Sequence, residues 1–96
     1  MKNKKYVIVR TYSAGCFAGY FESKNGQEVT LTQARRLWQW SGAASLSQLA
    51  VDGTSNPGGC KFPAPTMRHI LHQAIETIEA TEAAKKSIEA VPVWKV

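Results

Sequence analysis

Cysteines and acidic residues are scarce in this 96-residue sequence, and it has no long hydrophobic run. Two cysteines are too few for a disulfide scaffold, although one bridge remains possible. No segment approaches the roughly 18 consecutive apolar residues of a membrane span, so we expect no integral membrane protein. The 44 % hydrophobic and 20 % charged residues are typical of a soluble globular chain, and we expect a single domain over residues 1–96.

A cleaved leader is not expected either. Residues 7–9 are apolar and follow three lysines, and residues 13–16 faintly resemble a lipoprotein cleavage box. Arg10 interrupts the apolar run after these three residues, whereas a signal peptide needs about 7–15 of them. We therefore expect a mature cytoplasmic protein, a compartment that free cysteines suit.

The few acidic residues leave a net charge of +5, and this charge is uneven. Residues 1–68 carry nine basic and three acidic side chains, whereas residues 69–96 carry three and four. A basic body suggests an anionic partner, either nucleic acid or a phosphorylated small molecule. A basic surface that only keeps the protein soluble is the plain alternative.

Residues 5–12 are β-branched and aromatic, which predicts a strand, and both of its faces suit an inner position in a sheet. Segments 17–23 and 28–31 flank Asn25-Gly26, the favoured dipeptide of a two-residue hairpin turn. With these two residues in the turn, Phe21 should lie opposite Thr30 and Tyr20 opposite Leu31.

Three short helices are predicted after the hairpin. Apolar residues predict a helix over 32–40, Ser45 caps a second over 46–51, and Thr81 caps a third over 82–90. Between them, glycines and prolines predict an irregular loop over 53–66. Pro92 ends the third helix, and residues 91–96 suit a short edge strand that carries Trp94.

The predicted helix over 32–40 divides its aromatic residues. About 100° of rotation per residue turns Trp38 inward with Leu37 and places Arg36 beside Trp40 on the outer face. A Trp next to an Arg on an outer face can stack on a base and hold a phosphate. Packing of Trp40 under the 53–66 loop is the alternative.

Arg10 stands in an otherwise apolar strand, so its charge must be paired or must face a cavity or an edge. It leads through Tyr12 and Ser13 into a turn at Gly15, where backbone N–H groups can approach an anion. An ion pair with Glu22 or Glu28 is the alternative.

The sequence contains little that indicates a metal site or a catalytic site. His69 and His72 are three residues apart, and Cys16 and Cys60 are not part of a Cys-x-x-Cys pair, so we expect no zinc site. The chain has no phosphate-loop motif and no nucleophile with an evident base beside it. We expect a protein that is not an enzyme and needs no cofactor.

The run Arg10-Thr11-Tyr12-Ser13-Ala14-Gly15, together with residues 34–43 (ARRLWQWSGA) and Ser45-Leu46, resembles a family of short bacteriophage proteins. The likeness extends over most of the chain and implies that residues near 68–79 form a strand. Periodicity alone would make residues 67–79 a helix. We adopt the strand, and with it an α+β fold: a small mixed or antiparallel sheet packed with two or three short helices.

In size, basic charge and aromatic–arginine composition, the chain is also similar to phage sponges that sequester nucleotide messengers of bacterial immune systems. This likeness implies binding of an NAD-derived or cyclic nucleotide in the host cytoplasm, by a homo-oligomer. Phosphates would pair with arginines, a base or ribose would stack on aromatic rings, and the turn would donate hydrogen bonds; the residues are Arg10, Arg35, Arg36, Tyr12, Trp40, Ser13 and Gly15. A nucleic-acid-binding or host-protein-inhibiting module is the alternative.

Overall fold

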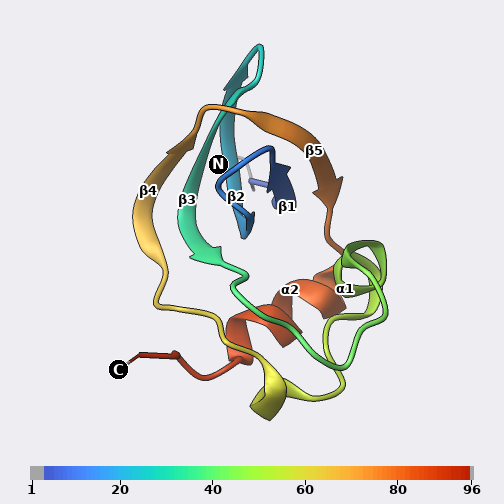
Figure 1. The fold of residues 1–96 in the computed structure, drawn as a ribbon. Coiled ribbons are helices and arrows are strands. Elements are labelled where there is room, and N and C mark those ends of the chain that lie inside the picture. Colours follow the sequence, from blue (N-terminus) through green and yellow to red (C-terminus); the bar gives the residue numbers. More distant parts are fainter. Residues whose placement is uncertain (1–3, 96) are drawn as a thin grey trace.

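The computed structural model describes residues 4–95 and has the expected α+β fold. Five strands form one antiparallel sheet, and two α-helices pack at one end of it (Figure 1). None of the helices in the described residues is long and apolar enough to cross a membrane. The elements are β1 (Tyr6–Thr11), β2 (Cys16–Asn25), β3 (Glu28–Arg36), α1 (Leu46–Asp52), the 3₁₀ turn η1 (Pro57–Gly59), β4 (Thr66–Leu71), β5 (Ala74–Glu79) and α2 (Glu82–Ala90).

The sheet curls strongly, as its strand order shows. The order is β4-β3-β2-β1-β5, so β4 and β5 form opposite edges although only His72 and Gln73 separate them in the chain. Because a short connection spans only about 10 Å at 3.3 Å per residue, the two edges must approach each other at this corner. Figure 1 shows this turn passing from β4 to β5. Its backbone is hydrogen-bonded to the residue after β1 and to the β2–β3 hairpin: the Tyr12 N–H donates to the Gln73 carbonyl, and the Ala74 N–H donates to the Gln27 carbonyl, each at 2.9 Å.

The predicted strand over 5–12 is confirmed as β1, and it lies inside the sheet between β2 and β5. Its side chains alternate between two cores, as the period of a strand requires. Tyr6 and Ile8 join the core under the helices, which includes Leu49, Phe62 and Ile88. Val7 and Val9 join the second core, made by the sheet residues Phe17, Val29, Leu31, Ala34 and Leu71.

The hairpin is confirmed, but its predicted register is wrong. Gly26 and Gln27 form the turn, and Asn25 pairs with Glu28. Gly26 has a φ of 63°, which suits the first central position of a turn that needs a left-handed residue there. This turn moves each pairing by two positions, and a register shift between Phe21 and Ser23 takes one position back. Phe21 lies opposite Leu31, not Thr30, and Tyr20 opposite Thr32, not Leu31.

The predicted helix over 32–40 is also wrong, because β3 runs through Arg36. A β-bulge explains the helical spacing: Gln33, at φ 50°, is the extra residue between the Tyr20–Thr32 and Ala18–Arg35 pairs. In a regular strand, side chains three positions apart point to opposite faces. The extra residue brings them to the same face, so Leu31 and Ala34 enter the same core. A bulged strand thus imitates the first turn of an amphipathic helix.

The remaining elements agree better with the sequence. The strand adopted near residues 68–79 is extended as expected, but it consists of two strands, β4 and β5, separated by His72 and Gln73. The two predicted later helices are α1 and α2, with side-chain caps from Ser45 and Thr81. The 53–66 loop is irregular apart from η1 and isolated bridges. The expected strand over 91–96 is reduced to one bridge between Val93 and Phe62, and residue 96 lies outside the described part.

Candidate functional site

Three of the predicted site residues meet in one cleft of about 300 Å³ at the end of β3. The turn from Ser13 to Cys16 forms one wall, and Arg36, Leu37 and Trp38 form the other. We call this the Arg36 cleft. Its described lining contains one cation and no Asp or Glu, so it is suited to an anion.

Arg36 is held in place on two sides. Its guanidinium carbon lies 4.6 Å from the centre of the Phe17 ring, and Nη1 donates to the Ala14 carbonyl at 3.0 Å. A guanidinium has five N–H donors in a fixed plane. Since the described residues supply a single acceptor, donors remain for a ligand in the cleft.

The turn beside Arg36 is built around Thr11. The Thr11 hydroxyl donates to the Gly15 carbonyl at 2.7 Å and accepts from the Ala14 N–H at 2.9 Å. Gly15 has a φ of 91°, with nothing within 4 Å of where a Cβ would stand, so the turn needs glycine for its backbone and not for space. The backbone N–H groups of Ser13 and Gly15 have no acceptor among the described residues, although the Ser13 hydroxyl donates to Gln73.

Arg35 does not reach the cleft; it is 3 % exposed and lies under the helices. Burial lowers the pKa of its guanidinium. All of its five N–H donors are used on backbone carbonyls at 2.7 to 3.4 Å, those of Phe62, Pro63, Ile88, Val91 and Pro92. Its position predicts a structural role, because the side chain fastens the end of α2 and the segment after it to the sheet.

Arg10 and Tyr12 also lie outside the lining of the Arg36 cleft. The Arg10 guanidinium pairs with Glu76 of β5 at 3.0 Å, and not with the hairpin residues Glu22 or Glu28. Tyr12 is 77 % exposed at the start of the turn. The charge of Arg10 is thus balanced at the sheet surface.

The two tryptophans of the 32–40 segment exchange their predicted places. Trp40 is half-buried against the core under the helices, whereas Trp38, predicted to lie inside, is 61 % exposed and lines the cleft. Because the segment is extended, Arg36 and Trp38 share a face at a spacing of two. A period-two interpretation of these residues would have found this pair.

Trp38 lies beside Trp94, and Trp94 in turn lies beside Lys61; the sequence did not place either residue in the site. The Trp38 ring is parallel to that of Trp94 within 6°, with ring centres 6.5 Å apart, and Lys61 Nζ lies 5.5 Å from the centre of the Trp94 ring. Three extended segments bring them together: Gln39 bridges Lys61, and the Trp94 N–H donates to the Phe62 carbonyl at 3.0 Å. These contacts are all long-range, and nothing local in the sequence indicates them.

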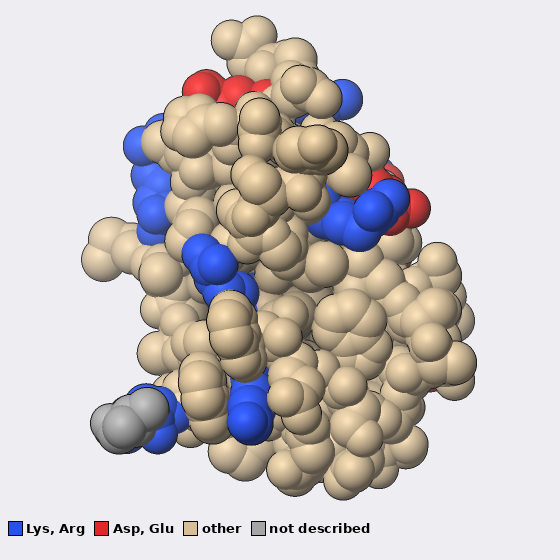
Figure 2. Space-filling model, viewed as in Figure 1, with Lys and Arg blue, Asp and Glu red and all other residues tan. Residues whose placement is uncertain are grey.

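The surface around the end of β3 is basic. Figure 2 shows acidic residues at the upper end of this face and on the β5 side, whereas the charged residues seen on its lower part, beside the end of β3 and the C-terminal segment, are all Lys or Arg. A field of one sign raises the local concentration of an anionic ligand. Part of the excess positive charge of the sequence therefore lies in the region of the Arg36 cleft.

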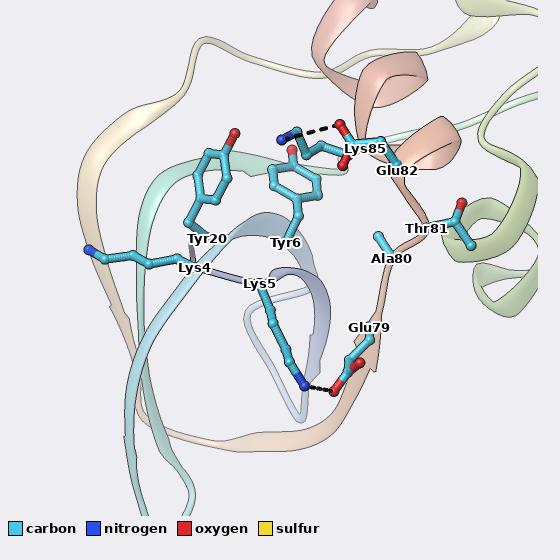
Figure 3. A pocket seen from close by; sticks show the side chains of 9 residues that line it. All are labelled: Lys4, Lys5, Tyr6, Tyr20, Glu79, Ala80, Thr81, Glu82 and Lys85. Atoms are coloured by element: carbon cyan, nitrogen blue, oxygen red, sulfur yellow. Dashed lines mark hydrogen bonds and ion pairs between the residues drawn. The ribbon is translucent and has the colours of Figure 1, made fainter. Parts of the chain in front are cut away.

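A second and larger cleft, of about 510 Å³, lies between the first residues of β1 and the start of α2 (Figure 3). Three lysines line it, but each pairs with a glutamate: Lys5 with Glu79 at 2.9 Å, Lys85 with Glu82 at 3.6 Å, and Lys4 with Glu22. Because its cations are balanced internally, this cleft is less suited to an anion than the Arg36 cleft.

The histidines and cysteines do not gather. The His69 Nδ1 atom is hydrogen-bonded to the Thr66 hydroxyl on β4 at 3.0 Å, and His72 pairs with Glu28 at 3.2 Å. Cys60 lies in the core under the helices. The described residues contain no group of three His, Cys, Asp or Glu side chains that could hold a metal.

Comparisons with known proteins identify the family of the chain and no function. No curated protein matches the sequence, and no solved structure matches the fold. A model of a domain of unknown function, DUF6948, matches residues 4–88, and the chain therefore belongs to the DUF6948 family.

Proposed function

We propose that the protein binds a phosphorylated nucleotide messenger in the Arg36 cleft and holds it without changing it. The observation that carries the proposal is that Arg36, with unused N–H donors, faces a cleft whose described lining has no carboxylate and includes an exposed Trp. Phosphate oxygens suit the planar fork of a guanidinium. The N–H groups of Ser13 and Gly15 add donors from the opposite wall.

The lining favours binding over catalysis. Cys16 is its thiol, and burial raises the pKa of this group, so it stays protonated and is a poor nucleophile at neutral pH. The Ser13 hydroxyl donates to the Gln73 amide oxygen, which is no general base. Sequestration of a messenger of bacterial immunity in the host cytoplasm is the role that the resemblance to phage sponges implies.

We further propose that the binding unit is a homo-oligomer. A volume of about 300 Å³ is at the lower end of ligand pockets, which cover roughly 300–1,000 Å³. One copy can therefore enclose one phosphorylated end of a dinucleotide, and a second copy would cover the rest. Sedimentation with and without the bound nucleotide measures this assembly.

The test is calorimetry with ADP-ribose derivatives and cyclic dinucleotides. Arg36→Ala should weaken binding of the recognised compound by about 10- to 100-fold, the value of a hydrogen-bonded charge. Arg68→Ala, which removes the same charge from β4 outside the cleft, is the matched control and should bind normally. Mass spectrometry should recover the compound unchanged.

The proposal fails if no compound of the panel binds. It also fails if Arg36→Ala binds as tightly as the wild type, or if the recovered compound is hydrolysed.

A further inference from the structure

We infer that the parallel pair Trp38 and Trp94 is the surface on which the base of the ligand stacks. This inference rests on the proposed function, since it assigns a place to the part of the ligand that Arg36 does not hold. The two rings are 61 % and 38 % exposed, and they lie parallel within 6° at a centre-to-centre distance of 6.5 Å. Offset-parallel aromatic rings in proteins lie at such distances.

The pair is arranged before any ligand arrives. Trp38 precedes Gln39, which exchanges two backbone hydrogen bonds with Lys61, and Trp94 follows Val93, which bridges Phe62. The backbone next to each ring is thus held by extended pairing. A rigid aromatic surface loses little conformational entropy when a planar ring docks on it.

Charge and position define what the pair would bind. Lys61 Nζ lies 5.5 Å from the centre of the Trp94 ring, and Trp38 is itself part of the Arg36 cleft. A ligand that uses both features needs a planar heteroaromatic ring joined to an anionic group. This combination selects a nucleotide with an accessible base, and it discriminates against a sugar phosphate or inorganic phosphate.

Arg35 positions one half of the pair. Its guanidinium bonds the carbonyls of Val91 and Pro92, and so holds the segment from which Trp94 projects. This segment lies beyond residues 4–88, the part of the chain that matches the DUF6948 model. Base recognition would therefore depend on residues outside the matched region, whereas phosphate recognition lies within it.

The experiment compares probes with and without a base. ADP-ribose and cyclic di-AMP carry adenine, and ribose 5-phosphate carries none; binding of each to the wild type and to variants is measured by calorimetry. Trp94→Ala should weaken binding of the recognised adenine probe about 5- to 100-fold, as loss of one stacked base does. Its affinity for ribose 5-phosphate should stay within about twofold.

Trp38→Leu is the second variant and should show the same loss for the adenine probe. Met67→Ala removes an exposed apolar side chain of β4 outside the cleft and should leave both affinities unchanged. Circular dichroism of each variant checks that the fold is retained.

The outcomes separate the two proposals. If Arg36→Ala weakens binding but both tryptophan variants bind the adenine probe like the wild type, the base surface is wrong and the Arg36 cleft stands. If neither adenine probe binds the wild type, both proposals fail. If only single-stranded oligonucleotides bind, with a steep dependence on salt, the ligand is a nucleic acid and the inference is overturned.

Discussion

Arg35 and Arg36 are consecutive residues whose guanidinium groups lie on opposite faces of β3. Arg35 is buried under the helices, where backbone carbonyls take all of its N–H groups, whereas Arg36 stacks on Phe17 beside an open cleft. Alternation along a strand produces this separation from two identical side chains. One arginine therefore fastens the fold, and its neighbour remains available for a ligand.

Replacing Arg35 should destabilise the protein strongly. Arg35→Met leaves buried carbonyls at the end of α2 without donors, and we expect the free energy of unfolding to fall by at least about 3 kcal/mol. Urea denaturation measures the loss. Arg68→Met on exposed β4 is the control and should stay within about 0.5 kcal/mol of the wild type. Equal stability of the two variants would contradict the structural role of Arg35.

Gly19 should not accept a side chain. A Cβ there would lie 3.0 Å from the Ala34 Cα and 3.0 Å from the Thr32 carbonyl oxygen, where the bulge of β3 presses against β2. We expect Gly19→Ala to cost about 1–3 kcal/mol, as overpacking in a core does. Gly58→Ala, whose nearest contact would be 4.0 Å away, should be almost neutral by thermal denaturation.

Thr81 links the two helices, and its loss should affect both. Its hydroxyl accepts from the Ala84 N–H at 3.0 Å and donates to the Val51 carbonyl at 2.6 Å. Thr81→Ala should lower the free energy of unfolding by about 1–2 kcal/mol, the upper range for an N-cap. Thr81→Ser keeps the hydroxyl and should retain most of the stability. If Thr81→Ser is as unstable as Thr81→Ala, the hydroxyl is not the cause.

Stability should decline as the pH falls below about 6.5, the pKa of an unfolded histidine. Burial, and then the nearby Arg36 charge, lower the pKa of His69 in the folded state, so the unfolded chain binds more protons below this pH. The contribution of His69 is present above pH 6.5 and is lost on acidification. His69→Gln should reduce the decline between pH 7 and 5 in urea titrations, and an unchanged decline in this variant would contradict the assignment to His69.

Elements with local sequence signals were predicted correctly, whereas the prediction was wrong where long-range pairing decides between helix and strand. Ser45 and Thr81 cap their helices by bonds to residues three positions away, and both helices are found as expected. The spacing of Leu31, Ala34 and Leu37 fits a helix equally well, and only pairing with β2 makes it a bulged strand. The error over 32–40 then misplaced Trp38 and Trp40.

Within the predicted site, Ser13, Gly15 and Arg36 come together because the turn after β1 faces the end of β3. Arg35 could not be separated from Arg36 by composition, since its partners Phe62, Ile88 and Val91 are more than 25 residues away. Lys61 and Trp94 join Trp38 through backbone bridges of the same long range. Side-chain type indicated the candidate residues, and topology decided which of them meet.

The two-residue turn between β4 and β5 affects how this protein resists aggregation. An open sheet presents two edges on which another chain can add a strand, and such edges seed fibrils. Here the Gln73 carbonyl and the Ala74 N–H are bonded to Tyr12 and Gln27, so both edges end in paired backbone at that corner. At the other end of β4, Pro63 and Pro65 precede the strand and lack N–H donors. Strand addition is thereby limited to the outer sides of β4 and β5, each only six residues long, and short edges disfavour edge-to-edge aggregation.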